Sequence, residues 1–79
     1  MAERTTSTEV IDREAAAERL EEIAAALRNS EDCTVHVGNK DITLSPPETV
    51  NYSIGVTEKQ RRFRGSRETV RVELDWKPE

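Results

Sequence analysis

The fold is decided by the stretch Thr69-Val70-Arg71-Val72-Glu73-Leu74-Asp75-Trp76, in which apolar and polar residues alternate strictly. Successive side chains of a β-strand point to opposite faces, so this stretch has one apolar and one polar face. Earlier stretches alternate in the same way. The apolar set is Val35, Val37, Ile42, Leu44, Val50, Tyr52, Ile54, Val56, Val70, Val72, Leu74 and Trp76. A shift of one residue would invert burial along a whole strand, so the pattern strongly specifies a one-faced antiparallel sheet.

The turns agree with this alternation. Gly38-Asn39 is a two-residue loop of a kind favoured in β-hairpins. Residues paired across antiparallel strands must share a face. The loop satisfies this rule, because it predicts the pairs Cys33–Leu44, Val35–Ile42 and His36–Asp41.

Two further turns extend the sheet. A five-residue loop over 45–49, which contains Pro46-Pro47, sets Leu44 against Val50 and Ile42 against Tyr52. The last hairpin predicts the pairs Val50–Trp76, Tyr52–Leu74, Ile54–Val72 and Val56–Val70. These pairings together predict a four-stranded antiparallel meander.

A helix precedes the sheet. Asp12 is a typical N-cap, residues 15–28 are rich in strong helix formers, and Asn29-Ser30 ends the segment. Its apolar stripe is Ala16, Leu20, Ile23, Ala24 and Leu27. We therefore expect an α+β fold in which one helix packs on one face of the meander. Residues 12–77 would form this domain, and residues 1–11 an N-terminal arm or a short additional strand over 5–10.

Composition limits the class of protein. The chain has 79 residues, of which 35% are charged, against about 25% in an average globular domain. Residues 1–33 carry nine acidic and four basic residues, and residues 34–79 carry seven and eight. The net charge of -4 argues against a general nucleic-acid binder. The acidic excess and the preference for Arg over Lys suit a halophilic archaeon, although a GC-rich genome would give the same preference.

Cellular location follows from what the sequence contains. Cys33 is the single cysteine, which excludes an internal disulfide and favours a small buried hydrophobic residue. The N-terminal residues show no apolar signal-peptide region, and no apolar run is long enough to span a bilayer. We expect a cytoplasmic protein without a membrane partner.

The helix flanked by acids, the Leu44-Ser45-Pro46-Pro47 turn and the strand closed by Trp76 together resemble the Amphi-Trp domain, over about residues 8–77. The resemblance implies a compact helix-plus-sheet module of unknown activity, found in haloarchaea and some bacteria. It transfers no catalytic residues. The Arg-rich loop of the last hairpin departs from the polar or acidic loop expected there.

The first candidate site is that Arg-rich loop, residues 59–67. Its cationic and aromatic members are Lys59, Arg61, Arg62, Phe63, Arg64 and Arg67. Arginines bind phosphates and an aromatic ring stacks on an unpaired base, a combination used by proteins that bind single-stranded RNA or DNA. The alternative is a solvated loop whose charges pair with nearby carboxylates and protect the sheet edge. At 1 M salt the Debye length is about 3 Å, so phosphate attraction would be weak in a salt-rich cytoplasm.

The second candidate is the polar face of the sheet. A partner would contact His36, Asn51, Ser53 and Arg71 there. Gly55 leaves a bare backbone position near the middle of this face, which would admit a ligand or only accommodate twist. Antiparallel sheets commonly leave one face wet without any function, so both interpretations stay open.

No catalytic constellation is evident. His36 opposite Asp41 has the form of an oriented base, but Cys33 lies on the other face and no nucleophile accompanies the pair. A surface ion pair is the simpler interpretation. We therefore expect a non-enzymatic protein-interaction or adaptor module without cofactor or metal. Its partner is an unknown protein or a second copy of the chain, and single-stranded nucleic acid is the alternative ligand.

Overall fold

The computed structural model describes residues 3–60 and 65–78. The chain divides into two compact units. The N-terminal unit comprises Met1–Pro46 with Pro78–Glu79, and the C-terminal unit comprises Pro47–Lys77.

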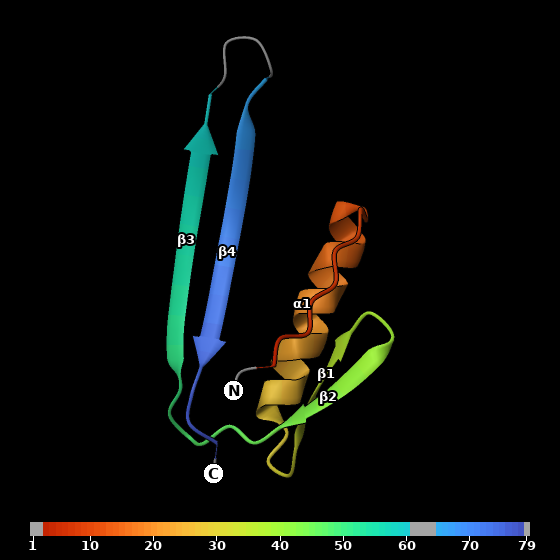
Figure 1. Ribbon diagram of the computed structural model, residues 1–79, viewed down its shortest axis with the longest axis vertical. Helices are drawn as coiled ribbons and strands as arrows, with labels where there is room; N and C mark the ends of the chain where they lie inside the picture. Colours follow the sequence, from red (N-terminus) through yellow and green to blue (C-terminus); the bar gives the residue numbers. More distant parts are fainter. Residues whose placement is uncertain (1–2, 61–64, 79) are drawn as a thin grey trace. The chain divides into compact units, whose positions relative to one another are not determined.

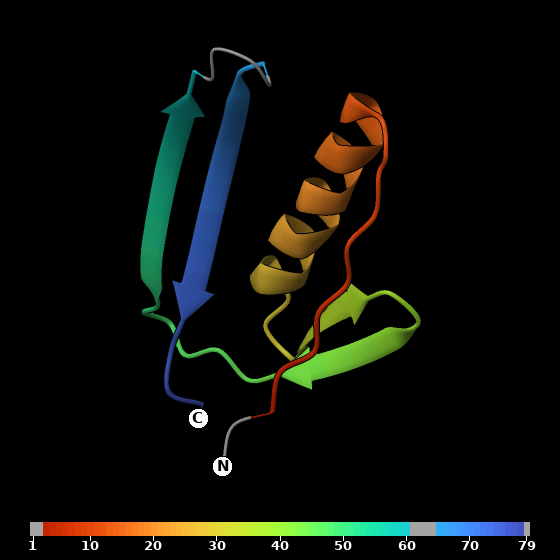
Figure 2. The same ribbon diagram turned by 45° about the horizontal axis from the view of Figure 1, so that its top comes forward.

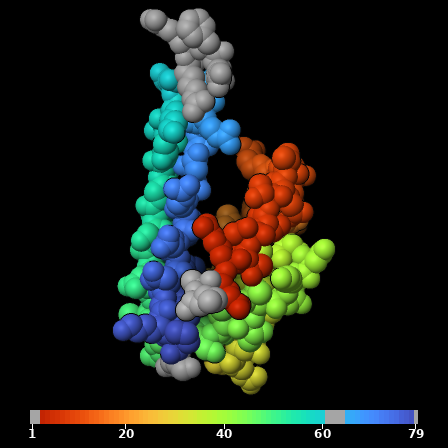
Figure 3. Space-filling view, in the orientation of Figure 1, coloured from red at the N-terminus to blue at the C-terminus, as the bar shows by residue number. Residues whose placement is uncertain are grey.

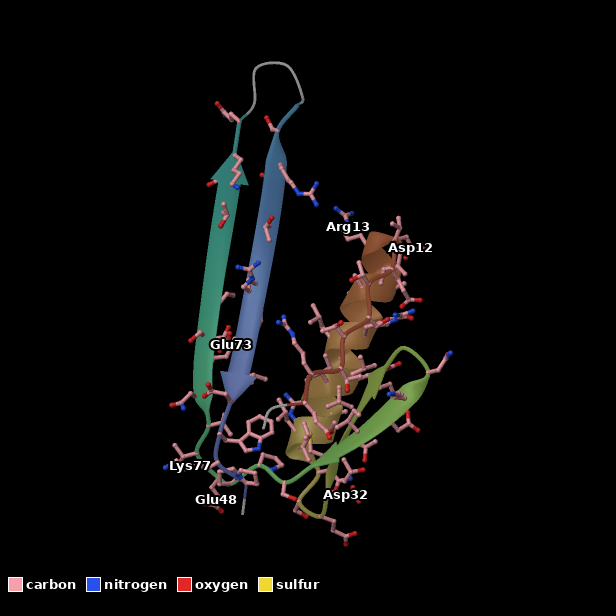
Figure 4. The ribbon with its side chains drawn as sticks, viewed as in Figure 1. Asp12, Arg13, Asp32, Glu48, Glu73 and Lys77 are labelled. Carbon is pink, nitrogen blue, oxygen red and sulfur yellow. The ribbon has the colours of Figure 1, made fainter. Side chains whose placement is uncertain are left out.

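The N-terminal unit contains the only helix of the described residues, α1, Arg13–Arg28 (Figure 1). Asp12 is its N-cap, as predicted, and the Asp12 Oδ1 atom accepts a hydrogen bond of 2.7 Å from the Ala15 amide. Asp12 and Arg13 mark this helix start in Figure 4. The helix ends at the predicted residue, where the Asn29 amide donates to the Ala26 carbonyl. Alanine-rich sequence, an N-cap and a basic residue in the last turn together account for the helix.

The first hairpin joins β1, Cys33–Val37, to β2, Lys40–Leu44. All three predicted pairs are present: Cys33–Leu44, Val35–Ile42 and His36–Asp41. Gly38 has a φ of +61°, while no described non-glycine residue has a positive φ. Positive φ at the first loop position alone is the pattern of a type II′ turn, whose twist suits a two-residue hairpin.

The helix and the first hairpin are in contact within the N-terminal unit. Helix α1 contacts β1. Cys33, at the start of β1, is 1% exposed and forms no disulfide, which confirms the prediction of a small buried hydrophobic residue. Val35, Val37 and Ile42 are half-buried. Leu44 is exposed and Thr34 is half-buried, so burial follows the alternation only in part.

The N-terminal segment follows α1 back toward the first hairpin (Figure 1, Figure 2). Residues 3–12 form neither helix nor strand, so the predicted short strand over 5–10 is not found. Glu9 forms an ion pair with Arg19 of α1. A Cβ atom at Gly38 would lie 3.3 Å from the Ser7 Oγ atom. An arm held by side-chain contacts therefore replaces the strand.

The C-terminal unit is a long hairpin of β3, Asn51–Lys59, and β4, Arg67–Asp75. The predicted pairs Tyr52–Leu74, Ile54–Val72 and Val56–Val70 are all present. The ladder ends at Asn51–Asp75, so the predicted Val50–Trp76 pair lies one position beyond it. In the space-filling view the two strands lie side by side along the hairpin (Figure 3).

The helix and four antiparallel strands confirm the α+β class, but the sheet arrangement differs from the prediction. The strands form two two-stranded sheets and not one four-stranded meander. The predicted pairs Leu44–Val50 and Ile42–Tyr52 do not occur in either ladder. Residues 45–50 lie outside the strands, and Pro46-Pro47 provides no amide hydrogen for a ladder. The boundary between the two units falls between these prolines. Among the described residues, no helix has the length and apolarity needed to cross a membrane.

Candidate functional site

The predicted Arg-rich loop is only partly described. Arg61, Arg62, Phe63 and Arg64 lie outside the described residues. Lys59 and Arg67 are described, and they are not loop residues: Lys59 is the last residue of β3 and Arg67 the first of β4. The register places them directly opposite each other. Two of the predicted loop cations therefore belong to the sheet.

The predicted sheet-face contacts are divided between the two units. Asn51, Ser53 and Arg71 occupy alternate positions of the β3–β4 hairpin and share one of its faces. The Asn51 Nδ2 atom donates a hydrogen bond of 2.8 Å to Asp75 Oδ1, so this amide is engaged within the sheet. His36 belongs to β1 in the N-terminal unit.

His36 and Asp41 form the predicted ion pair across the first hairpin, between His36 Nδ1 and Asp41 Oδ1. Both side chains are about two-thirds exposed, at 62% and 67%. The hydrogen bond to Asp41, and then the negative charge of that carboxylate, raise the pKa of His36, and Glu22 of α1 adds a smaller contribution. This open geometry is that of a surface ion pair.

One face of the β3–β4 hairpin brings together three of the sequence-predicted cations, Lys59, Arg67 and Arg71. We call this surface the polar face: Ser53, Gly55, Thr57, Lys59, Arg67, Thr69, Arg71 and Glu73. All eight residues, together with Ile54, line one open depression. Glu73 lies on β4 within it (Figure 4). Three cations and one carboxylate give this depression a net positive charge.

The rungs of the ladder fix how these groups are spaced. Lys59 faces Arg67, Thr57 faces Thr69, and Gly55 faces Arg71. A Cβ atom at Gly55 would have no heavy atom within 4 Å. The space above Gly55 on β3, directly across the ladder from Arg71 on β4, is therefore open.

Charge balance on the polar face is incomplete. The ion pairs found among residues 3–60 and 65–78 are Glu9–Arg19 and His36–Asp41. Lys59, Arg67 and Arg71 thus form no ion pair with any described carboxylate. Like charges placed directly opposite each other in an antiparallel ladder are destabilising. The Lys59–Arg67 rung therefore favours an external anion.

Sequence reasoning placed Thr69 at a polar position of its strand but missed Thr57, and it named neither as a site residue. The sequence contains the signal for these positions. If Val56 pairs with Val70, the next pair toward the loop is Thr57–Thr69, and the same register continues to Lys59–Arg67. The predicted loop over 59–67 includes Lys59 and Arg67, whereas both residues belong to the strands. The prediction therefore separated them from Arg71.

The opposite surface of the hairpin is its apolar face: Tyr52, Ile54, Val56, Val70, Val72 and Leu74. Within the C-terminal unit taken by itself, five of these side chains are exposed, with at least 46% for Val72 and at least 67% for Val70. Glu58 faces Glu68 on this side, at the end of the ladder nearest the loop. The apolar face thus carries an acidic pair at one end.

In the part of the chain that the structure describes, no group of three or more His, Cys, Asp and Glu side chains is placed to hold a metal ion.

Comparison with known proteins gives one match. The model of the Amphi-Trp domain matches residues 1–79. The search of curated proteins gives no match, and neither does the search of solved structures.

Proposed function

The chain belongs to the Amphi-Trp domain family, and from that premise we propose that it is a non-enzymatic protein-interaction module whose partner is a second copy of itself. The family match names no activity, so the proposal rests on one observation: the exposed apolar face of the β3–β4 hairpin. Contiguous exposed apolar patches larger than a few hundred Å² are uncommon on monomers and mark interaction sites.

The size of the face supports this role. Each strand has nine residues, so the hairpin is about 30 Å long at about 3.3 Å per residue. An isolated two-stranded hairpin is at best marginally stable in water. Covering Tyr52, Ile54, Val56, Val70 and Val72 would stabilise the hairpin and remove apolar surface from water.

Charge supports a second copy as the covering partner. A two-fold interface places the same patch on both partners. With the two hairpins antiparallel, the Glu58–Glu68 pair of each copy lies at the far end from its counterpart. Repulsion between the two acidic pairs is therefore avoided.

The test replaces one rung of the apolar face by isosteric polar residues, in the double variant Val56→Thr with Val70→Thr. Both substitutions keep β-branching, so strand propensity is retained. Each substitution occurs in both copies, so four unpartnered hydroxyls are buried, and at about 1 kcal/mol each they cost about 4 kcal/mol, which corresponds to about a thousandfold weaker dimerisation. Sedimentation equilibrium over a wide range of protein concentration measures the change. The matched control, Thr57→Ser with Thr69→Ser, alters the adjacent rung on the polar face and leaves the dimer unchanged.

Two outcomes would contradict the proposal. One is a wild-type chain that stays monomeric at every concentration. The other is a double variant with unchanged mass but a lower urea midpoint at all concentrations, because the face would then be covered within a single chain.

Single-stranded nucleic-acid binding is the second candidate function. Its specific support is the Lys59–Arg67 rung, which holds a cation at each end of the Arg-rich loop. The triple variant of Arg61, Arg62 and Arg64 to alanine tests the loop itself. It should weaken binding similarly for all sequences and flatten the salt dependence. Unchanged affinity would rule out the loop as the binding site.

A further inference from the structure

We infer that the polar face of the β3–β4 hairpin binds the phosphodiester backbone of a single-stranded oligonucleotide along its length. The binding residues are Lys59, Arg67 and Arg71, the hydroxyls of Thr57 and Thr69, and the open backbone at Gly55. This site differs from the Arg-rich loop, whose residues 61–64 do not enter it, and it is independent of the apolar face.

The cations of this face form no ion pair with the described residues. Lys59 and Arg67 face each other, and no described carboxylate pairs with either of them or with Arg71. Like-charge neighbours across a ladder lower the stability of the hairpin. An anion bound between them removes that repulsion. The face is thus more stable with an anion than without one.

The spacing of the cations excludes a single phosphate as the complete ligand. The Lys59–Arg67 rung and the Gly55–Arg71 rung are four residues apart along each strand, which is about 13 Å at about 3.3 Å per residue. Side chains stand roughly perpendicular to a sheet, so a phosphate held over one rung lies too far from the other rung to contact it as well. The ligand must therefore carry negative charges repeated along its length, as a nucleic-acid backbone does.

The centre of the face suits the same ligand. Thr57 and Thr69 face each other between the two cationic rungs, and their hydroxyls can donate hydrogen bonds to phosphate oxygens. Gly55 has no side chain, and nothing occupies the space that its Cβ would take. A sugar-phosphate unit can approach the backbone there while Arg71 holds its phosphate from the opposite strand.

Glu73 sets one end of the site. It lies on the same face two residues beyond Arg71, and it is the one carboxylate that lines the depression. Its charge repels a phosphate chain, so binding should stop there. Removing this charge should therefore strengthen binding, which a loss of folding could not imitate.

The experiment measures fluorescence anisotropy with a labelled, mixed-sequence single-stranded RNA about eight nucleotides long, a length within the site sizes of single-strand binders. Inorganic phosphate and a mononucleotide are tested as competitors. Arg71→Gln should weaken binding about threefold to fivefold, the range for one exposed charge pair. It should also lower the slope of log K against log salt by about 0.7, the value for one phosphate contact with a single strand.

Two further variants separate binding from folding. Gly55→Val fills the open space with a strand-favouring side chain, so it should raise the urea midpoint and yet weaken binding. Glu73→Gln should strengthen binding about threefold, again the range for one exposed charge. The control Val56→Thr changes the opposite face and leaves RNA affinity unchanged.

Each remaining outcome overturns the inference. If Arg71→Gln and Gly55→Val bind like wild type while the loop triple variant does not, the ligand binds the loop and not the polar face. If inorganic phosphate or the mononucleotide displaces the RNA at equal concentration, the ligand is a free phosphate. If the RNA does not bind even at low salt, the face is not a nucleic-acid site.

Discussion

Replacing Asp12 with alanine tests whether α1 protects the first hairpin. The Asp12 carboxylate accepts a 2.7 Å hydrogen bond from the Ala15 amide, and loss of such an N-cap costs about 1 kcal/mol. Helix α1 contacts β1, and Cys33 at the start of β1 is 1% exposed. If the thiol is exposed only when α1 leaves β1, its labelling rate follows the opening equilibrium.

The expected change is about a fivefold increase in the labelling rate, since 1 kcal/mol changes an equilibrium by about that factor. The assay follows the reaction of Cys33 with a chromogenic thiol reagent under native conditions. The control is Asp12→Asn, which keeps a good N-cap and removes only the charge that favours the helix N-terminus, so we expect a change of about twofold. If Asp12→Ala lowers the helical circular dichroism and leaves the labelling rate unchanged, α1 does not protect Cys33.

Three further predictions concern single residues. Trp76 is half-buried, so Trp76→Ala should lower the free energy of unfolding by about 2 kcal/mol, less than the 3–5 kcal/mol typical of a fully buried aromatic residue, as measured by urea denaturation. Gly38→Ala should lower the free energy of unfolding by about 1 kcal/mol and the thermal midpoint by several degrees. The reason is that Gly38 has a φ of +61° and that its new Cβ would lie 3.3 Å from Ser7 Oγ. An unchanged midpoint would contradict the turn geometry. The raised pKa of His36 means that its pairing with Asp41 stabilises the fold below the unfolded pKa of about 6.5, and that this contribution disappears as pH rises through the folded pKa. An NMR titration should show the His36 pKa falling in Asp41→Asn, and a constant value would mean that the pair does not form in solution.

Much of the fold follows from the sequence because local and pairwise rules agree. The helix bounds follow from Asp12 and from the alanine-rich segment that Asn29 ends. The registers follow from alternation, since a shift of one residue would turn Val35 to the polar face and His36 to the apolar face. These features depend on neighbours close in sequence or on one turn.

The division of the four strands into two sheets does not follow from the same rules. Leu44 and Val50 satisfy the parity rule, but parity only permits a pairing and does not supply its hydrogen bonds. Pro46-Pro47 lies between them and provides no amide hydrogen. Pairing β2 with β3 would also require closure of the loop between them, which costs conformational entropy, and the alternation of the strands does not show whether that cost is met.

The candidate site was predicted in pieces. The sequence pattern places Lys59 and Arg67 in a hairpin loop whose cationic residues surround Phe63, and Arg71 on a sheet face. The structure continues both strands to Lys59 and Arg67 and so unites the three on one surface. Arg61, Arg62, Phe63 and Arg64 lie outside the described residues, so their predicted role stays a prediction.

The last two rungs of the β3–β4 ladder carry opposite charges on opposite faces, with Glu58 facing Glu68 and Lys59 facing Arg67. This end of the ribbon is therefore polarised across its thickness. A polyanion approaching within a Debye length, about 8 Å at physiological ionic strength, is attracted to one side and repelled from the other before any contact forms. Under the inference made for the polar face, these charges would direct a nucleic acid away from the apolar face and would leave that face to the protein partner that we propose.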